Sequence, residues 1–424
     1  MKESDNRAVR QGSRLLSSRS NAFSTLRHAD FRKLWLADTL SVLGWQIQRM
    51  AITWHVYELT GDALALGALG LARFAPVIVF GLLGGVIADQ RDRRMILVYS
   101  HIALMFTSIA LVLATLDNRD TLAVIYAVTF ASSALNSLAG PARQALIPNL
   151  VPRNEIAGAA TMANLAMQAA MVVGPAIGGV LIAQTSLALV YGLNAIGFIA
   201  VIAAALAITA RPEIHVQSER GLRAIKAGFM YLWQTPILLA VMGLDFIATF
   251  FGAFTNLLPI FAGEIFGGGA NTLGILLSAP AAGAVVGSLV FGLMRMPSRP
   301  GLGMVACVIA YGLCIVGFGM SPSLWIAMLF LAGTGAADSI SMALRHTIRN
   351  LVTPDNYRGR IASAHSMFAM GGPQLGEFRA GTMASGMGAP AAVVIGGIGT
   401  VLAAIGAIRM VPKLGSKLTD IEER

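Results

Sequence analysis

The sequence predicts an all-α integral membrane protein, with twelve transmembrane helices in two pseudo-symmetric halves of six. Its composition, its long apolar runs and an internal repeat lead to this prediction. Of its 424 residues, 56% are hydrophobic and 12% are charged, whereas a typical soluble domain has about 25% charged residues. Helices fit the apolar runs, because a membrane-spanning barrel strand needs only about 10 residues of alternating polarity.

The loops between the apolar runs predict the topology. When the loops are numbered so that both termini lie on one side, nearly all lysines and arginines fall on that side, and Arg119 is the basic residue of the opposite loops. By the positive-inside rule, both termini are expected in the cytoplasm. The expected spans are 33–57, 64–88, 95–116, 121–146, 156–184, 186–209, 236–262, 272–294, 302–319, 323–350, 360–384 and 388–410.

An internal repeat relates the two halves of the chain. The pentapeptide GPAIG at 174–178 aligns with GPQLG at 372–376, and each copy comes after an Asn-Leu-Val sequence. Only the second copy leads into charged residues, Glu377 and Arg379. Small residues let helices approach closely, so both copies are expected to pack helices together. The expected packing residues are Gly174, Pro175, Gly178, Gly179, Gly372, Pro373 and Gly376.

The spans and polar stretches divide the chain into five expected regions. Within 211–236, the longest interior polar stretch, the apolar residues at 222, 225, 229 and 233 share one helical face. This pattern predicts a short amphipathic helix on the cytoplasmic membrane surface. The net charge of +10 gathers near the membrane, so lipid rather than nucleic acid is the expected partner. The regions are a cytoplasmic tail (1–28), an N-terminal six-helix bundle (29–210), a cytoplasmic linker (211–235), a C-terminal six-helix bundle (236–411) and a cytoplasmic tail (412–424).

The stretch at 85–94 resembles the signature between the second and third spans of the major facilitator superfamily. That signature has a glycine, then an aspartate, then a basic pair, although positions 90 and 92 depart from it here. Basic residues after a span also serve topology alone, which is the simpler interpretation. The resemblance implies two six-helix bundles around a central cavity that work by alternating access. The matching residues are Gly85, Asp89, Arg93 and Arg94.

Further resemblance narrows the family. The Gly-Pro sequence of span five resembles the antiporter motif of exporters in this superfamily, with Ala170 where a glycine is usual; such residues also serve as packing or kink residues. Arg143 with PNLVP at 148–152, RGRI at 358–361 and GGPQLGEFRAG at 371–381 are similar to the branch of bacterial enterobactin (siderophore) exporters. This resemblance implies a small-molecule exporter of the bacterial inner membrane.

Charged residues within the expected spans are the candidates for function. Each would cost at least about 2.5–3.5 kcal/mol at a lipid-exposed helix centre, so each is expected to face a cavity or a partner. A structural salt bridge is the simpler interpretation of every one. Proton coupling needs a carboxylate that burial makes easier to protonate near neutral pH. The proton-coupling or gating candidates are Glu377, Asp245, Asp338, Arg73 and Arg379, and the substrate-cavity candidates are Asp38 and Arg49.

Glu377 and Arg379 predict a gate between the two bundles. Residues two apart on a helix point about 200° away from each other, so these two need separate partners. The family resemblance places spans two and eleven against each other, and Arg73 lies at a depth in span two that matches Glu377 in span eleven. We therefore expect Arg73 and Glu377 to make and break an ion pair at the outer end of the molecule.

The interior arginines favour an anionic or zwitterionic, partly aromatic cargo, because guanidinium groups hold carboxylates and phenolates well. No phosphate-binding GxxxxGK[ST] sequence is present, so protons rather than ATP are expected to drive transport. No enzymatic activity, cofactor or metal site is expected, and the protein is expected to act as a monomer. The alternatives are a multidrug efflux pump of the same fold and a non-transporting membrane receptor or scaffold.

Overall fold

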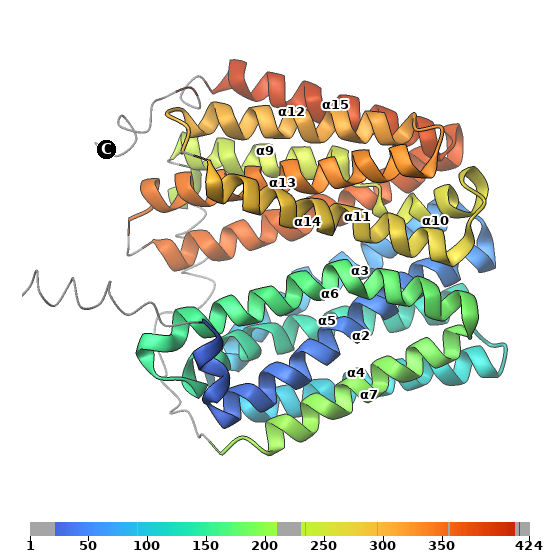
Figure 1. Ribbon diagram of the computed structural model, residues 1–424, viewed down its shortest axis with the longest axis vertical. Helices are drawn as coiled ribbons and strands as arrows, with labels where there is room; N and C mark the ends of the chain where they lie inside the picture. Colours follow the sequence, from blue (N-terminus) through green and yellow to red (C-terminus); the bar gives the residue numbers. More distant parts are fainter. Residues whose placement is uncertain are drawn as a thin grey trace, which may run out of the picture.

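The computed structural model describes residues 22–90, 92–209, 230–233, 235–294, 296–354, 357–411 and 415. The side chains of 81–90 and of part of 358–367 lie outside this description. The helices of the first half form one bundle and those of the second half form another, one below the other in the view of Figure 1. The structure is therefore all-α in the described residues, as the sequence predicts.

The N-terminal bundle contains six long helices and three short 3₁₀ turns. The short turns are η1 (Ala22–Arg27), η2 (Ile147–Leu150) and η3 (Arg153–Glu155). The long helices are α2 (Ala29–Thr60), α3 (Ala63–Gln90), α4 (Arg93–Leu116), α5 (Leu122–Leu146), α6 (Ile156–Gln184) and α7 (Leu187–Leu206).

The C-terminal bundle repeats this pattern, with one interruption. Its long helices are α9 (Pro236–Gly252), α11 (Gly269–Leu293), α12 (Pro300–Gly319), α13 (Leu324–Val352), α14 (Arg358–Met387) and α15 (Ala389–Met410). The predicted span at 236–262 falls within one apolar segment that is long enough to cross a membrane, Pro236–Ile265, but α9 ends inside it, at Gly252. Short segments then follow: η4 (Thr255–Leu257), α10 (Leu258–Ile260) and the π-helical turn η5 (Phe261–Ile265).

Ten segments of the described chain are long and apolar enough to cross a membrane. The two long helices that do not meet this criterion are α2 and α14. Their lengths, 32 and 30 residues, suffice for a span. Their low hydropathy reflects interior polar residues such as Gln48, Arg49 and Glu377. That α2 and α14 also cross the membrane remains a prediction.

The two Gly-Pro copies pack in equivalent ways. In α6, a Cβ on Gly174 or Gly178 would meet side chains of α2, at Gln46 and Met50 respectively. In α14, a Cβ on Gly372 or Gly376 would meet the backbone of α9. Each copy therefore presses its helix against the first helix of its own bundle, since glycine has no side chain to hold the backbones apart.

The bundles meet each other through α3 against α14 and through α6 against α11. At the first crossing, a Cβ on Gly67 would lie 2.9 Å from the Cα of Gly381. At the second, a Cβ on Gly274 would lie 3.1 Å from the Cα of Gly179. Both crossings lie toward the ends of the bundles that carry the α2–α3 and α14–α15 turns, away from residues 29 and 410. We call this the closed end, and the opposite end the termini end.

Candidate transport site

The interruption after α9 leaves backbone groups that the helix itself does not satisfy. Ala253 has extended geometry (φ −76°, ψ 129°) and Phe254 has φ −157°. Carbonyl groups at the end of α9 and N–H groups at the start of η4 therefore lack partners within a helix. Unpaired backbone groups inside a membrane cost several kcal/mol each, so another element must supply the partners.

Helix α14 supplies them through Glu377 and Arg379. The Glu377 carboxylate accepts hydrogen bonds from the N–H of Thr255 and from the N–H of Asn256, both at 2.9 Å. The Arg379 guanidinium donates to the carbonyl of Phe251 at 2.7 Å and to that of Ala253 at 3.3 Å. The two residues have separate partners, as their spacing predicts, and the backbone groups that they bind lie in the last turn of α9 and in the interruption after it.

The signs of these charges match the backbone groups that they bind. A carboxylate favours the positive N-terminal end of a helical segment, and a guanidinium favours the negative C-terminal end. Glu377 is 6% exposed, and the Arg379 guanidinium carbon lies 5.9 Å and 5.7 Å from the ring centroids of Phe250 and Phe251. Helix α14 thus fixes the shape of the interrupted segment.

Arg73 of the N-terminal bundle reaches the same segment. Its guanidinium donates to the side-chain oxygen of Asn256 at 3.0 Å and to the hydroxyl of Thr53 at 3.2 Å. Among the described residues no ion pair joins Arg73 directly to Glu377. In this conformation Asn256 joins them, because its side-chain oxygen accepts from Arg73 and its backbone N–H donates to Glu377. Whether the two charges form a gate remains a prediction.

Arg49 adds a second positive charge to this region. Its guanidinium carbon lies 5.7 Å from the centroid of the Trp45 ring, and it lies within electrostatic reach of Glu377 and Arg73. One carboxylate therefore faces two guanidinium groups from the N-terminal bundle. The junction has an excess of positive charge, which is what an anionic group would need.

A second charge cluster lies inside the C-terminal bundle. Arg345 of α13 forms ion pairs with Asp245 of α9 and, at 3.3 Å, with Asp338 of α13. The side chain of Asp245 is 5% exposed, whereas that of Asp338 is 50% exposed. Asp245 therefore has a structural ion pair, and Asp338 presents a carboxylate from the middle of a long helix. Arg345 is not among the candidates predicted from the sequence, although its spacing of seven residues from Asp338 places both on one helical face.

The N-terminal bundle contains the corresponding ion pair. Arg143 of α5 donates to both carboxylate oxygens of Asp38 of α2, at 3.1 and 2.8 Å. The first and fourth long helices of each bundle are thus joined by an aspartate and an arginine. Because Asp38 is paired within its own bundle, its expected cavity role has no support from this geometry. Among the described residues, Arg143 pairs with one carboxylate, that of Asp38, whereas Arg345 pairs with two, those of Asp245 and Asp338.

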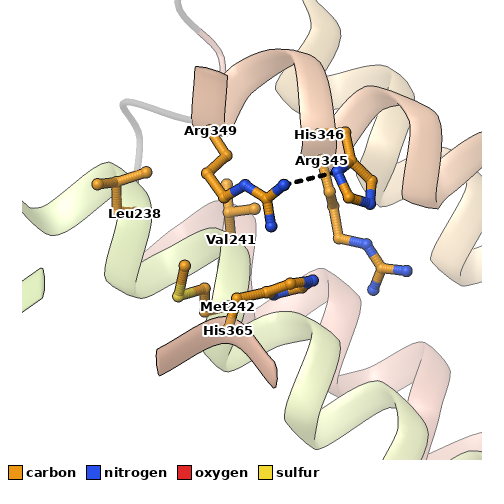
Figure 2. Close-up of a pocket in the computed structure, with 7 residues that line it drawn as sticks. All are labelled: Leu238, Val241, Met242, Arg345, His346, Arg349 and His365. Atoms are coloured by element: carbon orange, nitrogen blue, oxygen red, sulfur yellow. Dashed lines mark hydrogen bonds between the residues drawn. The ribbon is translucent and has the colours of Figure 1, made fainter. Parts of the chain in front are cut away.

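Figure 2 shows a pocket near the termini end of the C-terminal bundle. Arg349 donates to Nδ1 of His346 at 2.7 Å, and the His346 and His365 rings lie edge to face with centroids 5.9 Å apart. An apolar floor from α9 completes the pocket. Its lining residues are Leu238, Val241, Met242, Arg345, His346, Arg349 and His365. The pocket adjoins the Asp245–Arg345 pair, so the two features belong to one part of the bundle.

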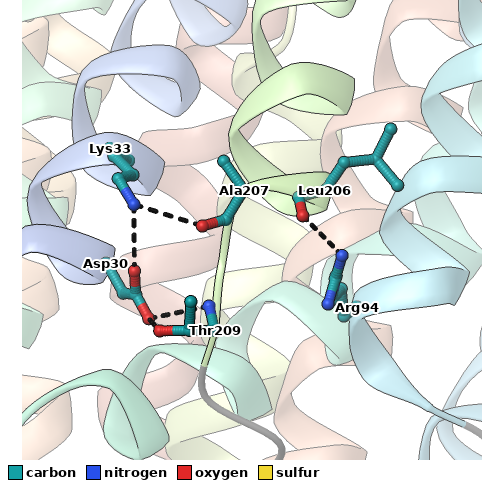
Figure 3. Close-up of polar contacts among 6 residues, drawn as sticks. All are labelled: Asp30, Lys33, Arg94, Leu206, Ala207 and Thr209. Carbon is teal, nitrogen blue, oxygen red and sulfur yellow. Dashed lines mark hydrogen bonds and ion pairs between the residues drawn. The ribbon is translucent and has the colours of Figure 1, made fainter.

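The basic pair of the 85–94 stretch binds the ends of other helices. Arg93 donates to the carbonyl of Ala145, near the end of α5, at 3.2 Å. Arg94 donates to the carbonyl of Leu206, at the end of α7, at 2.5 Å (Figure 3). Gly85 lies on α3, but the side chain of Asp89 lies outside the described residues, as does most of the expected amphipathic helix.

Helix α2 also binds the chain at the end of α7. Lys33 donates to the carbonyl of Ala207 at 3.1 Å, and the Asp30 carboxylate accepts from the N–H and the hydroxyl of Thr209 (Figure 3). Cations at the C-terminal end of a helix are favourable. The termini end of the N-terminal bundle is therefore tied together by charged side chains at the point where α7 ends.

The comparisons with known proteins agree with this architecture. The family model described as transmembrane secretion effector matches residues 20–422. The enterobactin exporter EntS of Citrobacter koseri is 27% identical over 375 residues, which cover 88% of this chain and 90% of that protein. A POT family transporter in complex with 5-aminolevulinic acid has a TM-score of 0.74 at 12% identity, covering 91% of this chain and 96% of that one. A bacterial homologue of the iron transporter ferroportin, in an inward-facing state, has a TM-score of 0.70 at 15% identity, covering 90% and 98%.

The matched family and the fold of the solved transporters describe the same kind of molecule. The family match covers nearly the whole chain, and the solved structures share its two-bundle fold. The superfamily predicted from the 85–94 stretch is thereby confirmed. The relatives and structural neighbours are transporters rather than enzymes. The chain is a multi-pass membrane transporter that belongs to the transmembrane secretion effector family of the major facilitator superfamily.

Proposed function

We propose that this transporter exports a small, anionic or zwitterionic amphiphilic molecule of the siderophore type, driven by protons through alternating access. The observation that carries the proposal is the position of Glu377. Its buried carboxylate organises the interrupted segment of the C-terminal bundle at the point where Arg73 of the N-terminal bundle binds. A proton on this carboxylate would change a contact between bundles, which is what coupling requires.

Alternating access requires contacts between the bundles that can separate. The glycine crossings at the closed end depend on backbone proximity rather than on interlocking side chains. Such contacts are lost together when the helices move apart, because each depends on the same close approach. With both termini in the cytoplasm of a bacterial inner-membrane protein, the closed end would face outward and the molecule would be in its inward-facing state.

The proposed cargo follows from the charges at the junction and from the relatives. Arg49 and Arg73 exceed the single carboxylate of Glu377, and Trp45 offers a flat ring beside Arg49. Guanidinium groups and aromatic rings together suit carboxylates or phenolates on an aromatic frame. The relative named as an enterobactin exporter supports a siderophore-like cargo.

A second candidate is efflux of lipophilic cationic drugs. The half-exposed carboxylate of Asp338 favours it, because a carboxylate in the middle of a helix can bind a cation. Arg345 neutralises only part of the charge of Asp245 and Asp338. This candidate uses the same fold but places the cargo site in the C-terminal bundle.

Transport into inside-out membrane vesicles separates the two candidates. Vesicles that contain the protein are energised with an inward-acid pH gradient and offered either a catecholate siderophore or a cationic dye. Uptake of the siderophore that collapses with a protonophore is the expected result, and vesicles without the protein provide the control. Proton-driven uptake of the dye without the siderophore would favour drug efflux, and uptake of neither would contradict both candidates.

A further inference from the structure

We propose that Asn256 is a positioning residue: through it, protonation of Glu377 weakens the hydrogen bond by which Arg73 holds the C-terminal bundle. This inference rests on the proposed function, in which Glu377 carries the proton. The backbone N–H of Asn256 binds the Glu377 carboxylate at 2.9 Å, and its side-chain oxygen binds Arg73 at 3.0 Å. One residue therefore joins a carboxylate of one bundle to a guanidinium of the other.

The surroundings of Asn256 give this link its strength. The residue is 2% exposed, and hydrogen bonds to charged groups in such an environment are stronger than bonds between neutral groups. Asn256 lies just after the end of α9, where Phe254 and Ala253 have left the helical conformation. We call the turn at 253–256 the corner. Because Ala253 and Phe254 have left the helical conformation, the position of the corner depends on its hydrogen bonds to Glu377 and Arg379 of α14.

The closed arrangement also contains an unsatisfied group. The side-chain nitrogen Nδ2 of Asn256 is buried without a hydrogen-bond partner, which destabilises the arrangement that holds it. An arrangement that frees this donor would remove that cost, so the unsatisfied donor favours release of the link between Asn256 and Arg73.

Protonation of Glu377 changes what the corner is bound to. The ionised carboxylate uses one oxygen for the N–H of Thr255 and the other for the N–H of Asn256. A proton taken from the aqueous phase converts one oxygen to a hydroxyl and removes the negative charge, so both hydrogen bonds weaken. The corner then moves, and the Asn256 oxygen leaves Arg73. Low pH should therefore favour opening of the closed end, and high pH should favour closure.

Other groups act on Glu377 from the elements packed around it. Arg49 of α2 and Arg73 of α3 lie within electrostatic reach of its carboxylate. Arg379 lies on its own helix, and the hydroxyl of Tyr311 of α12 is within electrostatic reach. Of these groups, Arg73 is the one that forms a hydrogen bond with the side chain of Asn256 among the described residues. The response to a proton on Glu377 consequently reaches the N-terminal bundle through Asn256.

The test compares two variants that each remove one hydrogen bond from Arg73. Asn256→Ala removes the bond between bundles, whereas Thr53→Val removes a bond inside the N-terminal bundle, at a residue that is 5% exposed. Spin labels at exposed Leu64 and Ser385, with Cys307 and Cys314 replaced by alanine, report the distance across the closed end in lipid nanodiscs. The open fraction is measured from mildly acidic to mildly alkaline pH.

The expected results differ between the variants. In the parent protein and in Thr53→Val, the open fraction should rise as the pH falls. In Asn256→Ala, the change in the open-to-closed ratio across the same pH range should be about tenfold smaller, the effect of one hydrogen bond to a charged group. Asn256→Asp keeps an acceptor for Arg73, so it should retain the pH response.

Four outcomes would overturn the inference or the proposed function on which it rests. A full pH response in Asn256→Ala, or an equal loss in Thr53→Val, would show that Asn256 does not transmit the signal. If Asn256→Ala does not fold, a flat response in well-folded Asn256→Asp would do the same. A parent protein with neither a pH response nor proton-driven export would refute the proposed function, on which the inference depends.

Discussion

At the scale of single residues, charged side chains in this protein serve two different purposes. Asp245 and Arg345 form a buried pair within one bundle, and Asp38 and Arg143 form its counterpart in the other. Glu377 and Arg379 instead bind backbone groups of an interrupted helix. Each ion pair joins two helices of the same bundle, whereas Glu377 lies where the two bundles meet.

The buried pair in the C-terminal bundle predicts a stability effect. Arg345→Gln leaves Asp245, whose side chain is 5% exposed, without its partner, and breaking a buried pair in this way costs about 3–5 kcal/mol. Thermal unfolding in detergent, followed by size-exclusion chromatography, should show a clear loss of stability. Arg143→Gln should cost less, because Arg143 is 25% exposed. The double variant Asp245→Asn/Arg345→Gln should recover much of the loss, and no recovery would contradict the pairing.

The sequence predicts which residues are charged inside the bundles but not which ones pair. Seven residues separate Asp338 from Arg345 on one helix, and that pair could have been found from spacing. The partner of Asp245 lies 100 residues further along the chain, on a helix that only tertiary packing brings close. Asn256 has no charge and no motif, so nothing in the sequence distinguishes it from an ordinary polar residue. Its role depends on an interruption that the sequence does not announce.

At the scale of elements, the interruption after α9 is the feature that hydropathy does not predict. The segment Pro236–Ile265 is apolar enough to count as one candidate span, although it contains Asp245. Gly252 and Pro259 are the local signals, but both residues also occur in continuous membrane helices. The backbone leaves the helix because Glu377 and Arg379 of α14 bind the freed groups. Most other helix boundaries follow from apolar length and turn residues, and the prediction placed them within a few residues.

The glycine crossings make a prediction about the closed end. A Cβ on Gly381 would lie 2.6 Å from the Cα of Gly67, so Gly381→Val should prevent α3 and α14 from meeting. Water-soluble maleimide labelling of a cysteine at Ala63, which is 7% exposed and lies at this crossing, should then increase severalfold, as the closed end stays open. Gly386→Val is the matched control, because a Cβ there meets nothing within 4 Å on the same helix. Equal labelling in the two variants would contradict the assignment of this crossing to closure.

At the scale of the whole molecule, the repeat explains both the symmetry and its exception. Each bundle presses a Gly-Pro helix against its first helix and joins its first and fourth long helices by an ion pair. The long apolar runs and the repeat predict this architecture from sequence, because both reflect local composition. The exception is the charged second copy, whose Glu377 and Arg379 act on α9. The functional asymmetry of the molecule therefore lies in α14.

The most direct test of this account is proton movement during transport by Glu377→Gln. In proteoliposomes with a pH-sensitive dye inside, a cargo gradient in the parent protein should move protons in the opposite direction. Glutamine keeps the size of the side chain and one acceptor oxygen but cannot carry the proton. Glu377→Gln should therefore still exchange cargo down its gradient while proton movement falls to the level of empty liposomes. Cargo-driven proton movement at the parent rate in Glu377→Gln would contradict the assignment of Glu377 as the proton carrier.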